Sequence, residues 1–342
     1  MKKNLYLLIL FFISFSINSK YISDEYLSYQ KELVKKINSH KTTWKSKLFP
    51  VDIRPLLGVL VNPETNTFYE ERLSIPTRNV TPIEGLPENF DLREQYPYCN
   101  SLLEIRDQSS CGSCWAVASV ETMSDRHCII SKGLQKPILS SYAVISCCSL
   151  CGKGCAGGLP YEAFIYWVGA GIPTGGDYGD KETCMPYFLP KCNHHMNDTG
   201  LPDCPKDVET PKCNKTCQEG YDKTYDEDRY FGSEYYTVKG EEQIKTEIYE
   251  RGSIEASFLV YEDFINYSEG VYQHVEGEAL GGHAIKIIGW GIENGVKYWL
   301  CVNSWNEFWG DHGTFKILRG EDHCGIEKSI VTGMPKLGYN IE

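Results

Sequence analysis

Apolar residues near the start of the chain follow a helical repeat. Four of them recur at helical spacing: Tyr26, Leu33, Val34 and Ile37. This pattern predicts an amphipathic helix, and Ser23 stands where its hydroxyl can cap the first turn. Residues 75–87 are rich in turn-forming residues and predict a linker.

The rest of the chain divides into a helical half and a strand-rich half. Cys114–Met123 and Pro160–Trp167 have no internal glycine or proline and predict helices. Three later apolar runs predict strands: residues 284–288, 298–302 and 314–318. Residues 184–232 lack periodicity and predict a long loop region held by disulfides. A helical half followed by a β half predicts an α+β fold with a cleft between the halves.

The first residues predict a signal peptide over 1–19. Lys2 and Lys3 precede the apolar run 5–13, and Ser19 is a small residue suited to cleavage. The run is too short to span a bilayer, which needs about 20 residues. The alternative is an N-terminal anchor helix. Since no later segment reaches membrane length, we expect a soluble mature protein without a membrane span, either lysosomal or endosomal, or secreted outside the cell.

Charge and cysteine content narrow the functional classes. The formal net charge of −12 leaves no basic surface for nucleic acid. Fifteen cysteines indicate a disulfide framework, and the odd number leaves at least one free thiol. None precedes Cys99, so the composition changes near residue 85. This change predicts a removable pro-segment over 20–85 before a domain at 86–342, with a structural N-terminal subdomain as the alternative. Four N-x-S/T triplets could accept glycans: Asn79, Asn197, Asn214 and Asn266.

The strongest chemical signal is the sequence Cys111-Gly-Ser-Cys114-Trp. A cysteine attacks as the thiolate, so a nucleophilic site must lower the thiol pKa. Cys114 stands at the expected start of a helix, where the dipole favours negative charge. Gln108 precedes it, and its side-chain amide could donate to an oxyanion beside the backbone N–H of Cys114.

A proton partner for this thiol is predicted at His283. Two glycines precede His283 and a strand-forming run follows it. Asn303 begins an Asn-Ser-Trp sequence at the end of another apolar run, and its oxygen could accept the imidazole N–H. Trp305 could shield that hydrogen bond from water. The ordered set Gln, Cys-Trp, Gly-Gly-His and Asn-Ser-Trp therefore predicts a cysteine nucleophile with an oriented base.

These motifs resemble those of papain-family cysteine peptidases, and most closely cathepsin B. The resemblance covers nearly everything after the signal peptide. It implies a papain-like α+β fold, with a helical left half and a β-barrel-like right half. It also implies that Gly157 and Gly158 pair with the substrate backbone. The family usually has Asn at the position of Ala156. The resemblance further implies six disulfides: Cys99–Cys128, Cys111–Cys155, Cys147–Cys213, Cys148–Cys151, Cys184–Cys217 and Cys192–Cys204.

Three cysteines remain outside that pairing. They are Cys114, Cys301 and Cys324. Cys301 is unusual for the family, and its place inside an expected strand predicts a buried, inert thiol.

The segment 192–204 resembles the occluding loop of cathepsin B. By that resemblance, His194 and His195 bind the C-terminal carboxylate of a substrate, which implies dipeptidyl carboxypeptidase as well as endopeptidase activity. One ion pair that pins the loop is preserved as His194 with Asp107. The other is lost, because the loop has no arginine and Phe308 replaces its aspartate. At the base of the pocket for the residue two before the scissile bond, Ser329 replaces a common glutamate, so we expect an apolar preference there.

Three other functional classes fit single features of the sequence. Cys111 and Cys114 could form a redox pair, but no thioredoxin-like context surrounds them. Cys148-x-x-Cys151 and Cys213-x-x-x-Cys217 have the spacing of zinc ligands. The third class is an inactive homologue that acts only as a binder. We expect no cofactor and no metal. Peptide and protein substrates, the pro-segment and cystatin-type inhibitors are the expected partners.

Overall fold

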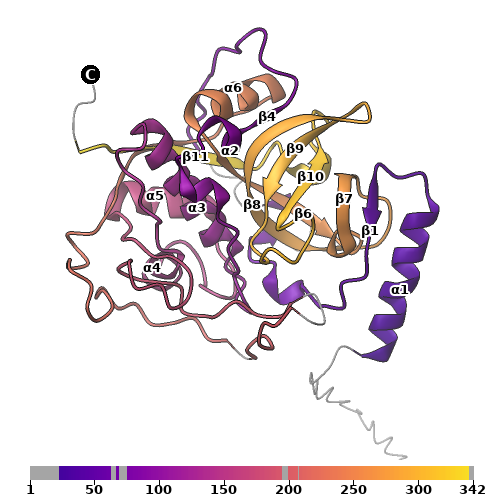
Figure 1. Cartoon of the computed structure of the whole chain (residues 1–342), viewed down its shortest axis with the longest axis horizontal. Coiled ribbons are helices and arrows are strands. Elements are labelled where there is room, and N and C mark those ends of the chain that lie inside the picture. The colour runs from indigo at the N-terminus through magenta and orange to yellow at the C-terminus, as the bar shows by residue number, and fades with distance from the viewer. Residues whose placement is uncertain (1–22, 63–66, 69–74, 195–198, 207, 339–342) are drawn as a thin grey trace, which may run out of the picture.

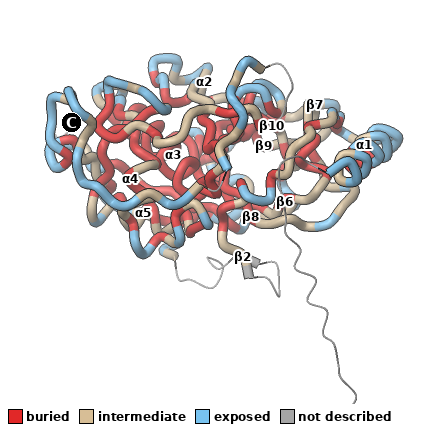
Figure 2. The backbone as a smooth tube through the Cα atoms, turned by 90° about the horizontal axis from the view of Figure 1, so that it is seen from below, coloured by how far each residue is buried: buried red, intermediate tan, exposed pale blue. Residues whose placement is uncertain are grey.

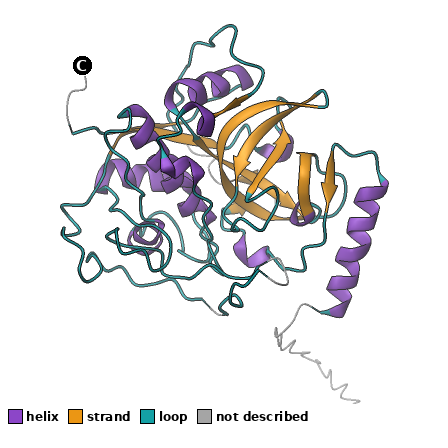
Figure 3. Ribbon diagram, in the orientation of Figure 1, coloured by secondary structure: helices purple, strands orange, loops and turns teal. Residues whose placement is uncertain are grey.

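The structure is a computed structural model that describes residues 23–62, 67–68, 75–194, 199–206 and 208–338. Most helices gather on one side of the strands, and the N-terminal helix lies beyond the strands on the opposite side (Figure 3); this mixture confirms the α+β fold that the sequence predicts. The α-helices are α1 (Asp24–Ser39), α2 (Leu92–Gln95), α3 (Cys114–Ile130), α4 (Ser141–Cys147), α5 (Pro160–Ala170) and α6 (Glu241–Arg251). The short 3-10 helices are η1 (Arg54–Leu56), η3 (Asn100–Leu103), η4 (Phe264–Asn266) and η5 (His323–Gly325).

One large sheet forms the barrel-like side of the molecule (Figure 1). Its strands run in the order β1-β7-β10-β9-β8-β6-β11-β5, and β4 also pairs with β8. All the pairs are antiparallel except β7 with β10. The strands are β1 (Trp44–Ser46), β4 (Phe90–Asp91), β5 (Gly232–Tyr236), β6 (Ile254–Tyr261), β7 (Tyr267–Tyr272), β8 (Ala279–Glu293), β9 (Val296–Val302), β10 (Thr314–Leu318) and β11 (Ile330–Pro335). A separate small sheet pairs β2 (Val61–Asn62) with β3 (Thr67–Phe68).

Helix α3 lies between the two halves, which explains why it is buried on every side. Sixteen of its seventeen residues are buried, and it packs on α5 on one side and on β8 and β11 on the other. Strand β8 is also buried along most of its length, because the barrel interior covers one of its faces and helices cover the other. The burial map shows this continuous interior as the red tube in Figure 2. The junction between α3 and β8 is therefore buried and closely packed, and it holds Cys114 and His283.

The predicted pro-segment is attached to the barrel side. Ser23 caps α1 by accepting a hydrogen bond from the Tyr26 N–H at 3.1 Å, which confirms the predicted N-cap. Strand β1 extends the sheet at β7, and α1 lies beside that edge (Figure 1). Seven apolar side chains of this segment join the same buried core as the barrel: Leu33, Ile37, Trp44, Phe49, Ile53, Leu56 and Val80.

The loop region predicted over 184–232 has no helix or strand among its described residues until β5 begins at its last residue, Gly232. Three disulfides hold it, namely Cys184–Cys217, Cys192–Cys204 and Cys147–Cys213. It wraps the helical half around α4 (Figure 1). Covalent cross-links thus replace the hydrogen-bonded ladders that this polar stretch cannot form.

Candidate active site

Cys114 is the first residue of α3 and is completely buried. Its sulfur accepts a hydrogen bond from the backbone N–H of Gly58 at 3.2 Å. Burial raises the pKa of the Cys114 thiol to about 11, and it outweighs the backbone N–H groups of Ala284, Gly58 and Trp115, which lower that pKa. The sequence predicts a lowered pKa at this helix start. The structure has a raised one because the predicted pro-segment excludes water from the sulfur.

His283 lies on β8 and is oriented from behind by Asn303. Its Nε2 is 2.8 Å from Asn303 Oδ1, and the Trp305 ring lies over the imidazole with 4.7 Å between ring centres. All three side chains are fully buried. His283 Nδ1 has no hydrogen-bond partner among the described residues. Burial lowers the pKa of His283 to about 4, although the hydrogen bond to Asn303 raises it. The imidazole is therefore neutral at neutral pH in this state.

Gln108 connects the cysteine side of the site to the histidine side. Its Nε2 donates to the carbonyl oxygens of Leu56 and Cys111, both at 2.8 Å. Its Oε1 accepts a hydrogen bond from the Ser304 hydroxyl at 2.7 Å, and the Ser304 N–H donates to Asn303 Oδ1 at 2.8 Å. Ser304 therefore links the Gln108 side chain to the Asn303 side chain that contacts His283. It stands inside the Asn-Ser-Trp motif, but the motif alone gives it no role.

The predicted pro-segment runs past the Cys114 sulfur in an extended conformation. Val59 bridges both walls of the site, in parallel with Gly158 and antiparallel with Gly282. The Gly158 N–H donates to the Gly58 carbonyl at 2.8 Å, and the Leu60 N–H donates to the Gly158 carbonyl at 3.2 Å. A side chain at Gly58 could not fit, because its Cβ would lie 2.0 Å from the carbonyl oxygen of Gly112.

Gly157 and Gly158 form the wall that the resemblance assigns to substrate pairing. Gly157 has φ of +106°, a conformation that L side chains rarely adopt. A Cβ at Gly158 would lie 2.5 Å from the Trp115 ring. Both positions therefore leave the backbone open to a neighbouring peptide, which here is the predicted pro-segment.

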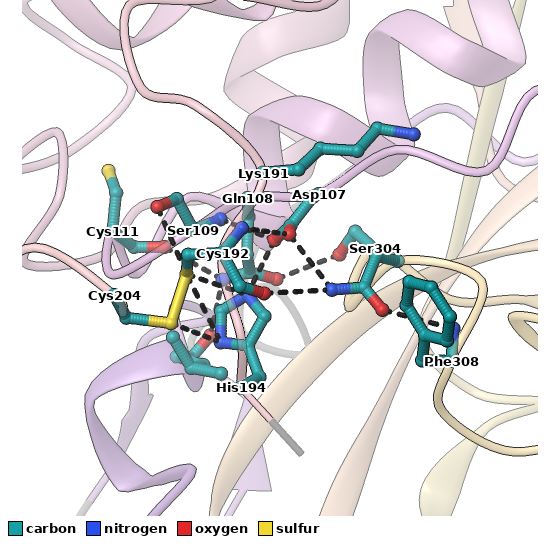
Figure 4. A network of polar contacts seen from close by, with 12 residues as sticks. Asp107, Gln108, Ser109, Cys111, Lys191, Cys192, His194, Cys204, Ser304 and Phe308 are labelled. Atoms are coloured by element: carbon teal, nitrogen blue, oxygen red, sulfur yellow. Dashed lines mark hydrogen bonds and ion pairs between the residues drawn. A yellow bond between two sulfur atoms is a disulfide. The ribbon is translucent and has the colours of Figure 1, made fainter. Parts of the chain in front are cut away.

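The described part of the predicted occluding loop is anchored through Asp107 (Figure 4). His194 Nε2 lies 2.5 Å from Asp107 Oδ1, and both side chains are buried. The other oxygen, Oδ2, accepts hydrogen bonds from the Cys192 N–H and from Asn306 Nδ2, each at 3.0 Å. Burial raises the pKa of Asp107. The contacts with His194, Asn306 and Cys192 lower this pKa by more than burial raises it, so the net shift is downward.

Three sequence-predicted features of the loop and its anchors meet different outcomes. His194 is buried against Asp107. In this position it anchors the start of the loop, and its ring is not exposed to a substrate. His195 lies outside the described residues, and so does the Asn197 glycan acceptor. Phe308 is 37% exposed and carries no charge, so the second ion pair has no acidic partner at that position.

Ser329 precedes β11 and is buried. Its hydroxyl has no hydrogen-bond partner among the described residues, and its carbonyl accepts from the Ser257 N–H at 2.8 Å. The Ser257 hydroxyl in turn donates to Glu255 Oε1 at 3.0 Å. Glu255 is a fully buried carboxylate on β6 that sequence reasoning missed. Only the register of β6 with β8, which places Glu255 opposite Lys286, brings Glu255 close to the site.

The cysteines are paired as the resemblance implies. The six disulfides are Cys99–Cys128, Cys111–Cys155, Cys147–Cys213, Cys148–Cys151, Cys184–Cys217 and Cys192–Cys204. The three free thiols are Cys114, Cys301 and Cys324. Cys301 is buried in β9, and burial raises its pKa well above the ordinary value.

These pairs weaken two of the alternative functions. Cys111 is bonded to Cys155 and leaves Cys114 free, so no redox pair forms between Cys111 and Cys114. The two zinc-like spacings belong to disulfides, whose sulfurs are not the thiolates that bind zinc. A third group brings Cys192, His194 and Cys204 together, but the two sulfurs of that group are also bonded to each other.

Comparison with known proteins identifies the family. A model of the papain family cysteine proteases matches residues 86–334. The chain is 52% identical to a cathepsin B-like cysteine proteinase 6 of Caenorhabditis elegans, over 74% of this chain and 67% of that protein. It is 50% identical to a cathepsin B-like cysteine proteinase of Schistosoma japonicum, over 73% and 74% of the two chains.

Solved structures of proenzymes have the same fold. Procathepsin B S9 from Trypanosoma congolense matches with a TM-score of 0.74 and 35% identity, over 90% of this chain and 98% of that one. Digestive procathepsin L2 of Tenebrio molitor matches with a TM-score of 0.64, over 92% and 91% of the two chains, and at 22% identity it supports the fold alone.

The agreement with a proenzyme extends over the N-terminal segment, so this chain is a proform with a pro-segment. Its disulfides and its relatives are those of a secretory-pathway protein. None of the helices in the described residues combines the length and apolar character that crossing a membrane requires. The chain therefore belongs to the papain family of cysteine proteases, as a cathepsin B-like member that hydrolyses protein substrates.

Proposed function

We propose that Cys114 is the nucleophile of this peptidase. After removal of the pro-segment, the Cys114 thiolate attacks the scissile carbonyl carbon and His283 carries the proton. The leaving amine takes that proton, and the acyl-enzyme is then hydrolysed by water. Asn303 holds the imidazole in place, since its Oδ1 accepts from the ring at 2.8 Å. Gln108 Nε2 and the Cys114 backbone N–H stabilise the oxyanion.

One observation carries this proposal. A backbone carbonyl, that of Leu56, already accepts from Gln108 Nε2 at 2.8 Å, while the neighbouring backbone lies on the Cys114 sulfur. The pro-segment thus occupies the site, and its Leu56 carbonyl oxygen contacts Gln108 Nε2, the donor that an oxyanion would use. The group facing the sulfur is the Gly58 N–H, which a nucleophile cannot attack. This arrangement supports residues 20–85 as an inhibitory pro-segment that follows a signal peptide over 1–19.

The predicted occluding loop, residues 192–204, supports an additional exopeptidase activity. His194 is the positioning residue, because its buried contact with Asp107 holds the start of the loop in place. His195 follows it directly and is the proposed contact for the C-terminal carboxylate of a substrate. The loop has one such anchor and lacks the acidic partner for a second, since Phe308 takes that place. We therefore assign dipeptidyl carboxypeptidase activity at acidic pH together with endopeptidase activity on longer chains.

Ser329 supports an apolar preference at the residue two before the scissile bond. A buried hydroxyl cannot neutralise a guanidinium group, and burying that charge unpaired is costly. Protein inhibitors of the cystatin type are proposed partners of the mature cleft. Either a lysosomal compartment or the extracellular space would supply the setting in which the pro-segment is removed.

The nucleophile is tested by comparing two buried cysteines. Cys114→Ala should abolish peptide hydrolysis by the processed enzyme, whereas Cys301→Ala should retain most of it. Both variants lose a buried thiol of the same size, so Cys301→Ala controls for the packing change. Thermal unfolding of both variants measures any loss of stability separately. Equal losses of activity from the two substitutions would refute the assignment of Cys114.

The loop is tested with paired substrates. His194→Ala and His195→Ala are each assayed on a peptide with a free C-terminus and on its amidated twin. We expect both variants to lose activity selectively on the free-acid peptide. His194→Ala should act by releasing the loop from its anchor, and His195→Ala by removing the charge that contacts the carboxylate. The amidated twin serves as the internal control for general damage. The exopeptidase role is wrong if neither substitution lowers cleavage of the free-acid peptide selectively.

A further inference from the structure

A cavity on the helical half is lined by none of the residues that the proposed reaction uses. Its volume is about 390 Å³, within the range of pockets that hold small molecules. It lies against the disulfide between Cys184 and Cys217. Four aromatic side chains line it: Tyr142, Tyr178, Tyr187 and Phe188.

The walls of this aromatic cavity combine flat rings with polar groups. Phe188 lies 5.3 Å from Tyr142 and 5.0 Å from Tyr187, measured between ring centres. Tyr178 is 59% exposed at the surface. Lys181 and Gln218 add polar side chains to the lining. Flat rings beside hydrogen-bonding groups suit a pyranose sugar, whose C–H face packs on an aromatic ring while its hydroxyls and N-acetyl group accept and donate.

The cavity contains its own acceptor for such a sugar. Asn214 and Thr216, the first and third residues of an N-x-T triplet, both line it. Both are exposed, and the Asn214 amide makes no hydrogen bond to the described residues. Cys213 and Cys217, which flank the triplet, are fixed by disulfides to Cys147 and Cys184. The acceptor is therefore held beside the aromatic rings.

We propose that Asn214 carries an N-linked glycan and that its first N-acetylglucosamine lies in the aromatic cavity. The donor is a lipid-linked oligosaccharide pyrophosphate of the secretory pathway. The bond between the sugar C1 and the pyrophosphate oxygen breaks, and a bond from C1 to Asn214 Nδ2 forms. The amide loses one proton, and the lipid pyrophosphate leaves with the electron pair. No oxidant or reductant is needed.

The other described triplets differ from Asn214. Asn266 is fully buried; its Nδ2 donates to Gln30 Oε1 at 2.6 Å, and its Oδ1 accepts from the Phe49 N–H at 3.1 Å. A glycan on Asn266 would displace the pro-segment, so the folded proenzyme carries none there. Asn79 is exposed in the linker and lines neither this cavity nor the other one found in the described chain.

The first experiment locates the glycan. The full-length chain is secreted from a eukaryotic host, with Cys114→Ala to keep it uncut, and peptide N-glycosidase digestion in heavy-oxygen water marks occupied asparagines for mass spectrometry. We expect the mark at Asn214 and none at Asn266. Thr216→Ala should remove the Asn214 mark, and Thr216→Ser should keep it. An unmodified Asn214 in the secreted protein overturns the proposal.

The second experiment tests the packing of the sugar. Release of the Asn214 glycan by the same glycosidase is timed on the native protein. Tyr178→Ala should speed release about fivefold, which corresponds to about 1 kcal/mol of lost contact. Tyr98→Ala is the matched control, because Tyr98 is also partly exposed, at 40%, but does not line the cavity; it should leave the rate unchanged. Equal rates for Tyr178→Ala and the parent would show a glycan that does not occupy the cavity.

Discussion

The pro-segment and the predicted occluding loop both lie at the catalytic site, but they are held in different ways. The pro-segment is joined by backbone hydrogen bonds to Gly158 and Gly282 and by apolar side chains in the barrel core. The loop is closed by the disulfide Cys192–Cys204 and attached through the ion pair between Asp107 and His194. Backbone pairing and apolar packing do not depend on charge at these contacts, whereas the loop anchor contains an imidazole and a carboxylate.

Because of this difference, the pro-segment would control activity irreversibly and the loop reversibly. The contacts of the pro-segment extend from α1 through β1 to Val59, so it is removed as a whole by cutting the chain. The loop has a single described ion-pair anchor, and such a contact can break and form again without any cut. In the proposed function, the first device keeps the enzyme latent, and the second selects between short and long substrates once it is active.

The largest expected effect comes from filling the space at Gly58. In Gly58→Val the new Cβ would meet the Gly112 carbonyl, so the pro-segment must leave the cleft. We expect its inhibition of the mature enzyme, measured with residues 20–85 added in trans, to weaken at least about a hundredfold. Lys41→Val adds the same side chain at an exposed position of the pro-segment and should change nothing. Unaltered inhibition by Gly58→Val would show that the segment does not lie as described.

Acid should weaken the pro-segment through His283. Its pKa is about 4 under the pro-segment and should return towards about 6.5 when the site opens. Between these two pH values the open form therefore binds one more proton than the closed form. The affinity of the pro-segment for the mature enzyme should be full above pH 6.5, fall as the pH drops, and level off near pH 4. The pKa difference of about 2.5 limits this effect to about three-hundredfold.

Calorimetric binding of the pro-segment between pH 4 and 8 measures this slope. His283→Gln removes the titrating group and should flatten most of it. The exposed ion pairs Lys36–Glu276 and Lys45–Glu269 leave a small residual slope. A slope that is the same in His283→Gln would place the acid sensitivity elsewhere.

A smaller effect is expected in the substrate pocket at Ser329. The parent enzyme should cleave Phe-Arg peptides faster than Arg-Arg peptides, because the pocket offers an arginine no charge partner at this position. Ser329→Glu should raise the rate on Arg-Arg peptides about tenfold, equivalent to about 1.4 kcal/mol. Ser329→Ala is the control and should leave the preference as it is. A parent enzyme that prefers Arg-Arg peptides contradicts this reading and would direct attention to the buried Glu255.

The smallest effect is expected from restoring a second loop anchor. The double variant Leu201→Arg with Phe308→Asp places opposite charges on the loop and on the segment after Asn303. A partly exposed ion pair is worth about 0–1 kcal/mol, so endopeptidase activity should fall by no more than about fivefold. Each single variant should leave the ratio of endopeptidase to exopeptidase activity nearly unchanged. A gain of endopeptidase activity in the double variant would argue against the loop as the limiting barrier.

Local patterns in the sequence are sufficient to predict several elements. Ser23 caps α1 and α3 begins at Cys114, because capping and the absence of breakers act over a few residues. The strands around Ile285 and Trp299 follow from short β-branched and aromatic runs. These features depend on neighbours in sequence, which a single chain displays directly.

Other features depend on contacts between distant residues and could not be predicted. The raised pKa of Cys114 comes from burial, to which the segment around Gly58, 56 residues earlier, contributes by lying on the sulfur. The link from Gln108 to Asn303 passes through Ser304, 196 residues after Gln108. Glu255 reaches the site only through the register of β6 with β8. Sequence motifs identify the reacting groups, but folding decides their protonation and their partners.

The most direct test of the account measures how fast Cys114 is alkylated before and after the pro-segment is removed. In the proenzyme the sulfur is buried and its pKa is about 11, so at pH 7 it remains a protonated thiol. Iodoacetamide labelling of Cys114, followed by mass spectrometry, should be at least about a hundredfold slower in the proenzyme than in the processed enzyme. Cys301 should remain unlabelled in both forms. Equal labelling rates at Cys114 in the two forms would contradict the claim that the pro-segment covers and neutralises the nucleophile.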